Sequence, residues 1–287
     1  MKALTFLARR FVAGETPASA IAVGQRLQAK GIRATFDQLG EDVKDREGAT
    51  RSAEANKRLL RLIPAEVEKN ISVKLTVLGL DISKDFCLEQ AAGILEVARE
   101  VGGFVRIDIE GSKHTQATVD VFHQLRKTYD NVGLALQAYL HRTQDDVKDA
   151  ISRGDRVRLC KGAYAEPPEV AIKKMDDIRA NFRSCAHLLL DQGHYPAIAT
   201  HDESLIQDSL DYTRENKIPA QRFEFQMLYG LRPRRWEELV AAGHNMRVYV
   251  PYGTHWFPYF YRRLRERKEN VLFVLKGVCP PDISLGD

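Results

Sequence analysis

Residues 71–109 read ISVKLTVLGLDISKDFCLEQAAGILEVAREVGGFVRIDI, and this stretch decides the fold. Its two ends, Ile71–Val77 and Phe104–Ile109, are short runs rich in β-branched and aliphatic residues, which is typical of buried strands. Between them, Cys87–Val101 has helical spacing, and the Gly102–Gly103 pair that follows suits a helix C-terminus. The stretch therefore predicts two parallel strands joined by a helix.

The same alternation extends over most of the chain. Eight runs are predicted strands: Arg33–Gln38, Ile71–Val77, Phe104–Ile109, Val132–Tyr139, Arg156–Cys160, Pro196–Thr200, Arg222–Leu228 and Asn245–Val250. Helical spacing occurs between them in Glu54–Val67, Cys87–Val101, Thr115–Tyr129, Glu169–Asp191, Glu203–Asn216 and Pro233–Ala242. From Asp37 to Tyr249 the strand-to-strand steps average about 30 residues, which is the size of a βα unit.

Repeated βα units predict an α/β protein whose parallel sheet closes into a (β/α)8 TIM barrel. An open, doubly wound sheet is the alternative. It usually has a glycine-rich turn after its first strand, and DQLGE at 37–41 is not such a turn. We therefore expect residues 1–287 to form a single barrel domain, with residues 1–30 as a helical N-terminal extension.

The composition is that of an ordinary globular protein, because 44% of its 287 residues are hydrophobic and 29% are charged. This excludes a disordered, collagen-like or disulfide-stapled chain, and a net charge of +4 requires no nucleic-acid partner. No apolar run is long enough to span a bilayer, and no secretory signal is recognised. Because the four cysteines form no CxxC pair, we expect reduced thiols and a cytoplasmic protein.

Polar side chains end or follow the predicted strands. They are Asp37, Lys74, Asp108, Gln137, Arg158, Lys161, Thr200, His201, Gln226 and Tyr249. The carboxyl ends of barrel strands form the mouth where catalytic residues collect, so we predict the functional site there. Burying this many polar groups is costly unless they have partners or a ligand. Asp108 and Glu110 share one side of a strand, but no histidine pair accompanies them, so no metal site is expected.

The segment after the last strand has the strongest local pattern. Its residues Tyr259, Arg262, Arg263 and Glu266 stand at i, i+3, i+4 and i+7, so on a helix they share one face. Arginine binds carboxylates or phosphates through two parallel hydrogen bonds. A solvated face with an Arg262–Glu266 pair is the alternative. The preceding VYVPYGTH, residues 248–255, favours a ligand role because it leads this helix from the strand to the mouth.

Together, these motifs resemble the proline dehydrogenase family. The resemblance covers about residues 36–273 and rests on LGE (39–41), SVKL (72–75), RIDIE (106–110), QAY (137–139), RLCKGAY (158–164), ATH (199–201), FEFQMLYG (223–230) and VYVPYGTHWFPYFYRRLRE (248–266). It implies a distorted (β/α)8 barrel with FAD at the mouth and the last helix above it. It also implies oxidation of L-proline to Δ1-pyrroline-5-carboxylate by hydride transfer to FAD, the first step of proline catabolism to glutamate.

The resemblance implies roles for residues at matching positions. The expected catalytic residues are Asp108, Arg158 and Tyr249, with Arg158 beside the flavin N5. The expected substrate-binding residues are Lys74, Arg262 and Arg263 for the carboxylate, Tyr164, Leu228, Tyr249 and Tyr259 for the ring, and Glu41 at the entrance. The expected FAD-binding residues are Ile109, Gln137, Arg158, Lys161, Gly162, Ala163, Thr200, His201, Gln226 and Glu266. Many relatives have tryptophan where this chain has Ala165. How the chain packs against the adenine of FAD therefore does not follow from the resemblance.

Partners are also implied by the resemblance. They are L-proline, a membrane quinone as electron acceptor, and a separate pyrroline-5-carboxylate dehydrogenase in transient contact, since the length resembles the monofunctional bacterial form. A quinone acceptor implies peripheral association with the inner face of the membrane. Residues 1–12 combine Lys and Arg with apolar residues and are a candidate for lipid contact, with a helix packed on the barrel as the favoured alternative.

Other functions stay open at this point. A hydroxyproline dehydrogenase on the same scaffold is the nearest, although the bulk of Tyr249 would crowd a 4-hydroxyl group. Another FAD barrel, such as a methylenetetrahydrofolate reductase, has no evident need for the two arginines. The third is a non-catalytic barrel. A nucleic-acid binder is disfavoured, because basic residues are interspersed with acidic ones.

Overall fold

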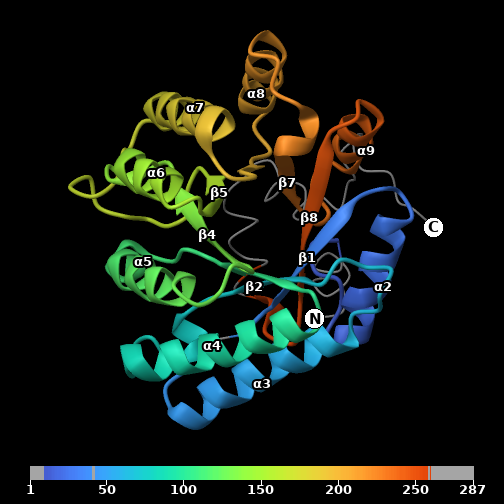
Figure 1. The fold of residues 1–287 in the computed structure, drawn as a ribbon, viewed down its shortest axis with the longest axis vertical. Helices are drawn as coiled ribbons and strands as arrows, with labels where there is room; N and C mark the ends of the chain where they lie inside the picture. Colours follow the sequence, from blue (N-terminus) through green and yellow to red (C-terminus); the bar gives the residue numbers. More distant parts are fainter. Residues whose placement is uncertain (1–9, 41–42, 258, 260–287) are drawn as a thin grey trace, which may run out of the picture.

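A computed structural model describes residues 10–40, 43–257 and 259 of the chain. Eight parallel strands close into a barrel in the order of the sequence, with β8 paired to β1 (Figure 1). The strands are β1 (Arg33–Gln38), β2 (Asn70–Val73), β3 (Phe104–Ile107), β4 (Val132–Gln137), β5 (Arg156–Cys160), β6 (Ala197–Ala199), β7 (Glu224–Leu228) and β8 (Asn245–Tyr252). The predicted (β/α)8 barrel is confirmed.

Helices surround the barrel (Figure 1). They are α2 (Pro17–Gln28), α3 (Arg46–Leu62), α4 (Lys84–Glu100), α5 (Ser112–Arg126), α6 (Thr143–Ser152), α7 (Met175–Gln192), α8 (Glu203–Glu215) and α9 (Pro233–Ala241), with 3-10 turns η1 (Thr76–Leu78) and η2 (Ala220–Arg222). Within the described ranges, no helix combines the length and apolar character needed to cross a membrane.

Helix α2 precedes the barrel and packs against β1 and β8. It begins at a capping box, in which the Thr16 hydroxyl accepts a hydrogen bond from the Ser19 N–H. A Cβ at Gly24 would lie 2.6 Å from the Phe36 ring of β1, so glycine permits the close approach of helix and strand. α2 thus covers the seam where β8 meets β1, the place that a helix following β8 takes in a regular barrel. The helix predicted from Tyr259 to Glu266 lies, apart from Tyr259, outside the described residues.

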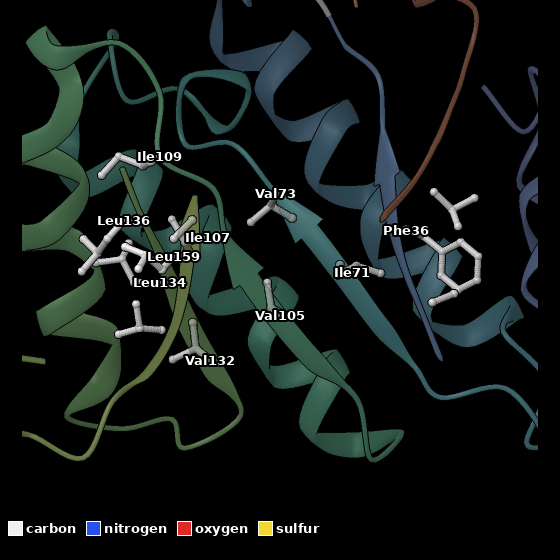
Figure 2. Close-up of a cluster of buried hydrophobic side chains, with 14 of the residues drawn as sticks. Phe36, Ile71, Val73, Val105, Ile107, Ile109, Val132, Leu134, Leu136 and Leu159 are labelled. Carbon is white, nitrogen blue, oxygen red and sulfur yellow. The ribbon is translucent and has the colours of Figure 1, made fainter. Parts of the chain in front are cut away.

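The strands alternate between a face toward the helices and a face toward the barrel axis. On the outer face, side chains such as Phe36, Ile71, Val105 and Leu134 form the hydrophobic core between sheet and helices (Figure 2). Burial of one such side chain contributes roughly 1.5–3 kcal/mol, so this layer supplies much of the stability of the fold.

The inner face is polar instead. The side chains buried inside the barrel include Thr35, Ser72, Arg106, Arg158, Glu224, Gln226 and Arg247. Regular barrels fill this space with bulky aliphatic side chains. Buried charges and polar groups are stable only when they are paired, so the interior of this barrel depends on its hydrogen bonds.

Several predicted boundaries are wrong. β2 ends at Val73 and not at Val77, because the chain turns into η1, whose C-terminal cap is Gly79 with a φ of 93°. α3 begins at Arg46 and not at Glu54, because the Asp45 side chain caps its first turn. α7 begins at Met175 and not at Glu169, because the chain before it forms a bridge between Leu140 and Ala171.

Candidate active site

Side chains from β1, β8 and the ends of β2 and β3 meet at the mouth of the barrel. The Lys74 ammonium donates to the Asp37 carboxylate at 2.8 Å and to the Tyr249 hydroxyl at 3.3 Å. Tyr249 in turn donates to the Asp108 carboxylate at 2.7 Å. The Lys74 ammonium also lies 3.7 Å from Asp108. Two carboxylates, an ammonium and a phenol therefore form one hydrogen-bonded group.

This group sets the protonation states of Lys74 and Tyr249. Burial by itself would lower the pKa of Lys74, but the carboxylates of Asp37 and Asp108 outweigh it and raise that pKa. Burial, reinforced by the charges of Asp108 and Asp37, raises the pKa of Tyr249 well above its usual value. At neutral pH, Lys74 is therefore a cation and Tyr249 a neutral phenol that donates a hydrogen bond.

Arg158 of β5 is fixed by contacts on several sides. Its Nε donates to Gln226 at 2.6 Å, its Nη1 to Asp108 at 2.5 Å and its Nη2 to Ser72 at 3.0 Å. The guanidinium carbon also lies 5.3 Å from the centre of the Tyr249 ring, a cation–π contact. A buried guanidinium with these partners has one orientation, so its charge is held in place beside Asp108.

Most of the described residues expected to hold the cofactor lie in or just after β4, β5 and β6. Gln137 is buried, and its side-chain amide donates to the Glu110 carbonyl at 3.0 Å. The Lys161 ammonium lies 3.0 Å from the Asp202 carboxylate, and the Asp202 N–H donates to the Thr200 hydroxyl at 3.1 Å. These bonds hold the loops after β5 and β6 together.

The hydrogen bonding of His201 determines which of its ring nitrogens carries the proton. Its Nε2 accepts a hydrogen bond from the Leu228 N–H of β7 at 2.9 Å. A ring nitrogen that accepts carries no proton, so neutral His201 has its proton on Nδ1. The side chain of Ile109, another expected cofactor contact, belongs to the buried core, which leaves its backbone as the part that a ligand would meet.

The turn from Lys161 to Ala163 requires glycine at its centre. Gly162 has a φ of +116°, a conformation that other residues rarely adopt. A Cβ at this position would also collide with the ring of Tyr139. The turn therefore offers bare backbone, which suits close approach by a flat or phosphorylated ligand.

The residues expected to enclose a substrate ring lie in different surroundings. Leu228 is opposite Tyr249 in the register of β7 and β8. Tyr164 lines a cavity of about 570 Å³ with Thr76, Glu110 and His114. Tyr259 is buried in an apolar cluster with Val12 and Leu39. Leu228 thus lies beside Tyr249 on the neighbouring strand, while Tyr164 and Tyr259 contact segments that follow the carboxyl ends of β1, β2 and β3.

Four predicted site residues lie outside the described residues: Glu41, Arg262, Arg263 and Glu266. Conversely, Ser72 and Asp202 bind predicted site residues without having been predicted themselves, and Asp37 was predicted at the mouth but without a specific role. The position of Asp37 at the end of a strand was a usable signal. For Ser72 and Asp202 the sequence carries no comparable signal, because their partners are brought to them only by closure of the barrel.

Comparisons with known proteins agree on one family. The proline dehydrogenase family model matches residues 20–276. Proline dehydrogenase 1 of Bacillus subtilis subsp. natto is 42% identical over 272 residues, which cover 94% of this chain and 90% of the relative. The bifunctional protein PutA of Escherichia coli (strain K12) is 28% identical over 319 residues, which cover 95% of this chain and 24% of the relative.

A solved structure shows the same architecture. It is proline utilization A (PutA) from Bdellovibrio bacteriovorus inactivated by N-propargylglycine, with a TM-score of 0.85 and 27% sequence identity. The match covers 99% of this chain and 36% of that chain, so the barrel described above corresponds to about a third of the larger protein.

Proposed function

Because this chain belongs to the proline dehydrogenase family, we propose that it oxidises L-proline to Δ1-pyrroline-5-carboxylate with FAD as the hydride acceptor. The family relationship makes the protein an oxidoreductase that acts on proline. The observation that carries the finer proposal is the group at the mouth, where Lys74, Asp108 and Arg158 are held in fixed positions. Such a group offers cations for an anionic substrate and for an electron acceptor that gains negative charge.

The described residues fit FAD. The turn at Gly162 exposes backbone for close contact. Four residues earlier in the sequence, the buried Arg158 guanidinium is fixed by three side chains. The residues proposed to hold FAD are Ile109, Gln137, Arg158, Lys161, Gly162, Ala163, Thr200, His201 and Gln226, with Glu266 outside the described residues. When bound, FAD supplies the two-electron acceptor that amino-acid side chains cannot provide.

The substrate carboxylate is proposed to bind cations of the mouth. An ammonium has three N–H donors, and Lys74 directs two of them to Asp37 and Tyr249. The third donor is proposed for the proline carboxylate, together with Arg262 and Arg263. Tyr164, Leu228, Tyr249 and Tyr259 are proposed to enclose the ring and exclude water, and Glu41 to pair with an arginine at the entrance.

The proposed reaction breaks the C5–H bond of proline and forms a C5=N double bond. A hydride leaves C5, and the proton of the neutral amine leaves nitrogen, so two electrons and two protons are removed in total. The chain contributes position and electrostatics. Lys74 holds the substrate, and the fixed charge of Arg158 stabilises the negative charge that develops on the acceptor. Asp108 keeps both Arg158 and Tyr249 oriented.

We extend the proposal to a membrane quinone as the final electron acceptor, reached from the cytoplasmic side by peripheral association. The product is proposed to pass to a separate pyrroline-5-carboxylate dehydrogenase.

A visible absorption spectrum tests the proposed function. We expect flavin bands in the purified protein that bleach on anaerobic addition of L-proline and return when a quinone is added. Bound flavin that does not respond to proline would overturn the proposal.

Steady-state kinetics test the role of the two arginines. Arg262→Met and Arg263→Met are expected to raise KM for proline far more than they change the FAD content. Unchanged proline kinetics in both variants would exclude the carboxylate-binding role.

A further inference from the structure

We infer that Glu224, a buried carboxylate of β7, is a positioning residue for Arg158 and acts on it through Gln226. The inference deepens the proposed function, because it rests on Arg158 stabilising the reduced flavin. Glu224 is 1% exposed and precedes Gln226 by two positions on the same strand, so both side chains point into the barrel.

Continuous hydrogen bonds connect Glu224 with the mouth. The Gln226 amide donates from Nε2 to Glu224 Oε1. The same amide accepts at Oε1 from Arg158 Nε at 2.6 Å. Arg158 then reaches Asp108 at 2.5 Å, and Asp108 accepts from Tyr249 at 2.7 Å. Glu224 is therefore linked through one intervening side chain, Gln226, to Arg158, whose charge is proposed to act on the flavin.

The chemistry of these groups determines the orientation of the amide. A guanidinium can only donate hydrogen bonds, and an ionised carboxylate can only accept them. Gln226 lies between one of each, so its NH₂ must face Glu224 and its carbonyl must face Arg158. Burial would favour the neutral acid at Glu224, but Arg247 outweighs it and holds the pKa of Glu224 at about 2. Glu224 is thus an acceptor at every pH at which an enzyme of this kind works.

An uncharged replacement removes this constraint. A glutamine at position 224 can donate or accept, so the Gln226 amide can rotate and turn its NH₂ toward Arg158. Two donors then face each other, Arg158 loses the acceptor for its Nε, and its guanidinium is free to move away from Asp108. Because the inside of the barrel is shielded from water, no solvent molecule readily replaces that acceptor.

Glu224 also has a structural role that must be separated from this one. It neutralises the buried Arg247, whose Nε lies 2.9 Å from Glu224 Oε1. Glu68 binds the same guanidinium, with distances of 3.0 and 3.1 Å from Arg247 Nη2 to its two oxygens. Glu68→Gln is therefore a matched control, because it removes one carboxylate from Arg247 and leaves the Gln226 amide with Glu224.

The experiment compares Glu224→Gln and Glu68→Gln in the FAD-loaded protein. The readouts are the flavin midpoint potential, kcat and KM for proline, and the thermal midpoint. For Glu224→Gln, we expect kcat to fall about tenfold with KM within about twofold, as for the loss of one hydrogen bond to a charged group. A tenfold weaker stabilisation of two-electron reduced flavin lowers the potential by about 30 mV. Glu68→Gln is expected to keep the potential and kcat of the parent, whatever its thermal midpoint.

Two further variants keep the test decisive. If Glu224→Gln does not fold, Glu224→Asp retains the charge for Arg247 but shortens the reach to Gln226, and the same drop in potential is expected. Gln226→Met should reproduce the drop, and the double variant with Glu224→Gln should add nothing further. Parent-like potentials in the Glu224 variants, or an equal drop in Glu68→Gln, would overturn the inference.

The failure of the proposed function would look different. The potential is measured by equilibration with a dye and needs no proline. A parent protein whose flavin ignores proline would disprove the proposed function, whereas the Glu224 comparison would still report on the environment of the flavin.

Discussion

Asp37 and Lys74 form an ion pair of 2.8 Å at the mouth of the barrel, between the end of β1 and the residue that follows β2. Asp37 is almost fully buried, and no described residue donates to its second oxygen, Oδ2. The ion pair is therefore the principal contact of this carboxylate. Its main effect falls on Lys74, whose charge in a half-buried position depends on nearby carboxylates.

Asp37→Asn is expected to make the activity sensitive to alkaline pH. Without this carboxylate, burial lowers the pKa of Lys74 with less opposition, so Lys74 loses its proton as the pH rises through the lowered value. The alkaline limb of kcat/KM for proline should therefore move to lower pH, while activity near neutral pH changes less. The profile is measured for parent and variant side by side, because titration of the substrate amine then affects both profiles equally.

Asp81→Asn is the matched control for this prediction. Asp81 pairs with His114 at 2.9 Å in the loop beside the same mouth, and it is not a partner of Lys74 in the described residues. Its pH profile should follow that of the parent. Superimposable profiles for Asp37→Asn and the parent would show that Asp37 does not control the charge of Lys74.

Tyr249→Ser is expected to shift substrate preference toward 4-hydroxyproline. The serine leaves space where the aromatic ring lies against Arg158, and it removes the hydroxyl that donates to Asp108. The ratio of kcat/KM for hydroxyproline to that for proline should rise about tenfold, the range typical for one altered packing contact. Tyr249→Phe retains the ring, so this ratio should stay near the parent value although activity falls. An unchanged ratio in the serine variant would place the specificity elsewhere.

Gly162→Ala is expected to reduce FAD content as well as stability. The substitution forces a side chain into a φ of +116° and against the Tyr139 ring. Gly154→Ala is the control, because Gly154 has a φ of +66° and open space around its Cβ position. The control should cost about 1–2 kcal/mol of stability for its backbone conformation alone, with FAD content unchanged. Equal FAD content in the two alanine variants would exclude a cofactor role for this turn.

Glu224 is expected to contribute stability that acid removes. Its pKa is lowered from 4.5 to about 2, so this contribution is fully present above pH 4.5 and is lost as the pH falls through the folded value. It amounts to about 3 kcal/mol at neutral pH. The free energy of unfolding of Glu224→Gln should approach that of the parent as the pH drops from 5 toward 2. A constant difference over this range, measured by urea unfolding, would contradict the assigned ion pair.

The helices, and the strand faces that pack against them, were predictable from local sequence patterns. Alternation of apolar runs with helical spacing reflects the face that each element buries, as Phe36, Ile71 and Val105 show. Boundaries were less predictable. The start of α3 depends on the Asp45 cap, and that of α7 on a bridge to Ala171, so neither follows from periodicity.

By itself, the sequence determined the barrel class and the family resemblance, because periodicity and ordered motifs are properties of the chain read in one direction. It also marked Lys74, Asp108 and Arg158 as candidates, since each lies in or just after a strand. Only the tertiary structure decided which partner each one has. Arg158 meets Ser72 across 86 residues of sequence, and Gln226 across 68. Closure of the sheet brings these strands around one axis, and the loss of water there makes hydrogen bonding of every buried charge an energetic necessity.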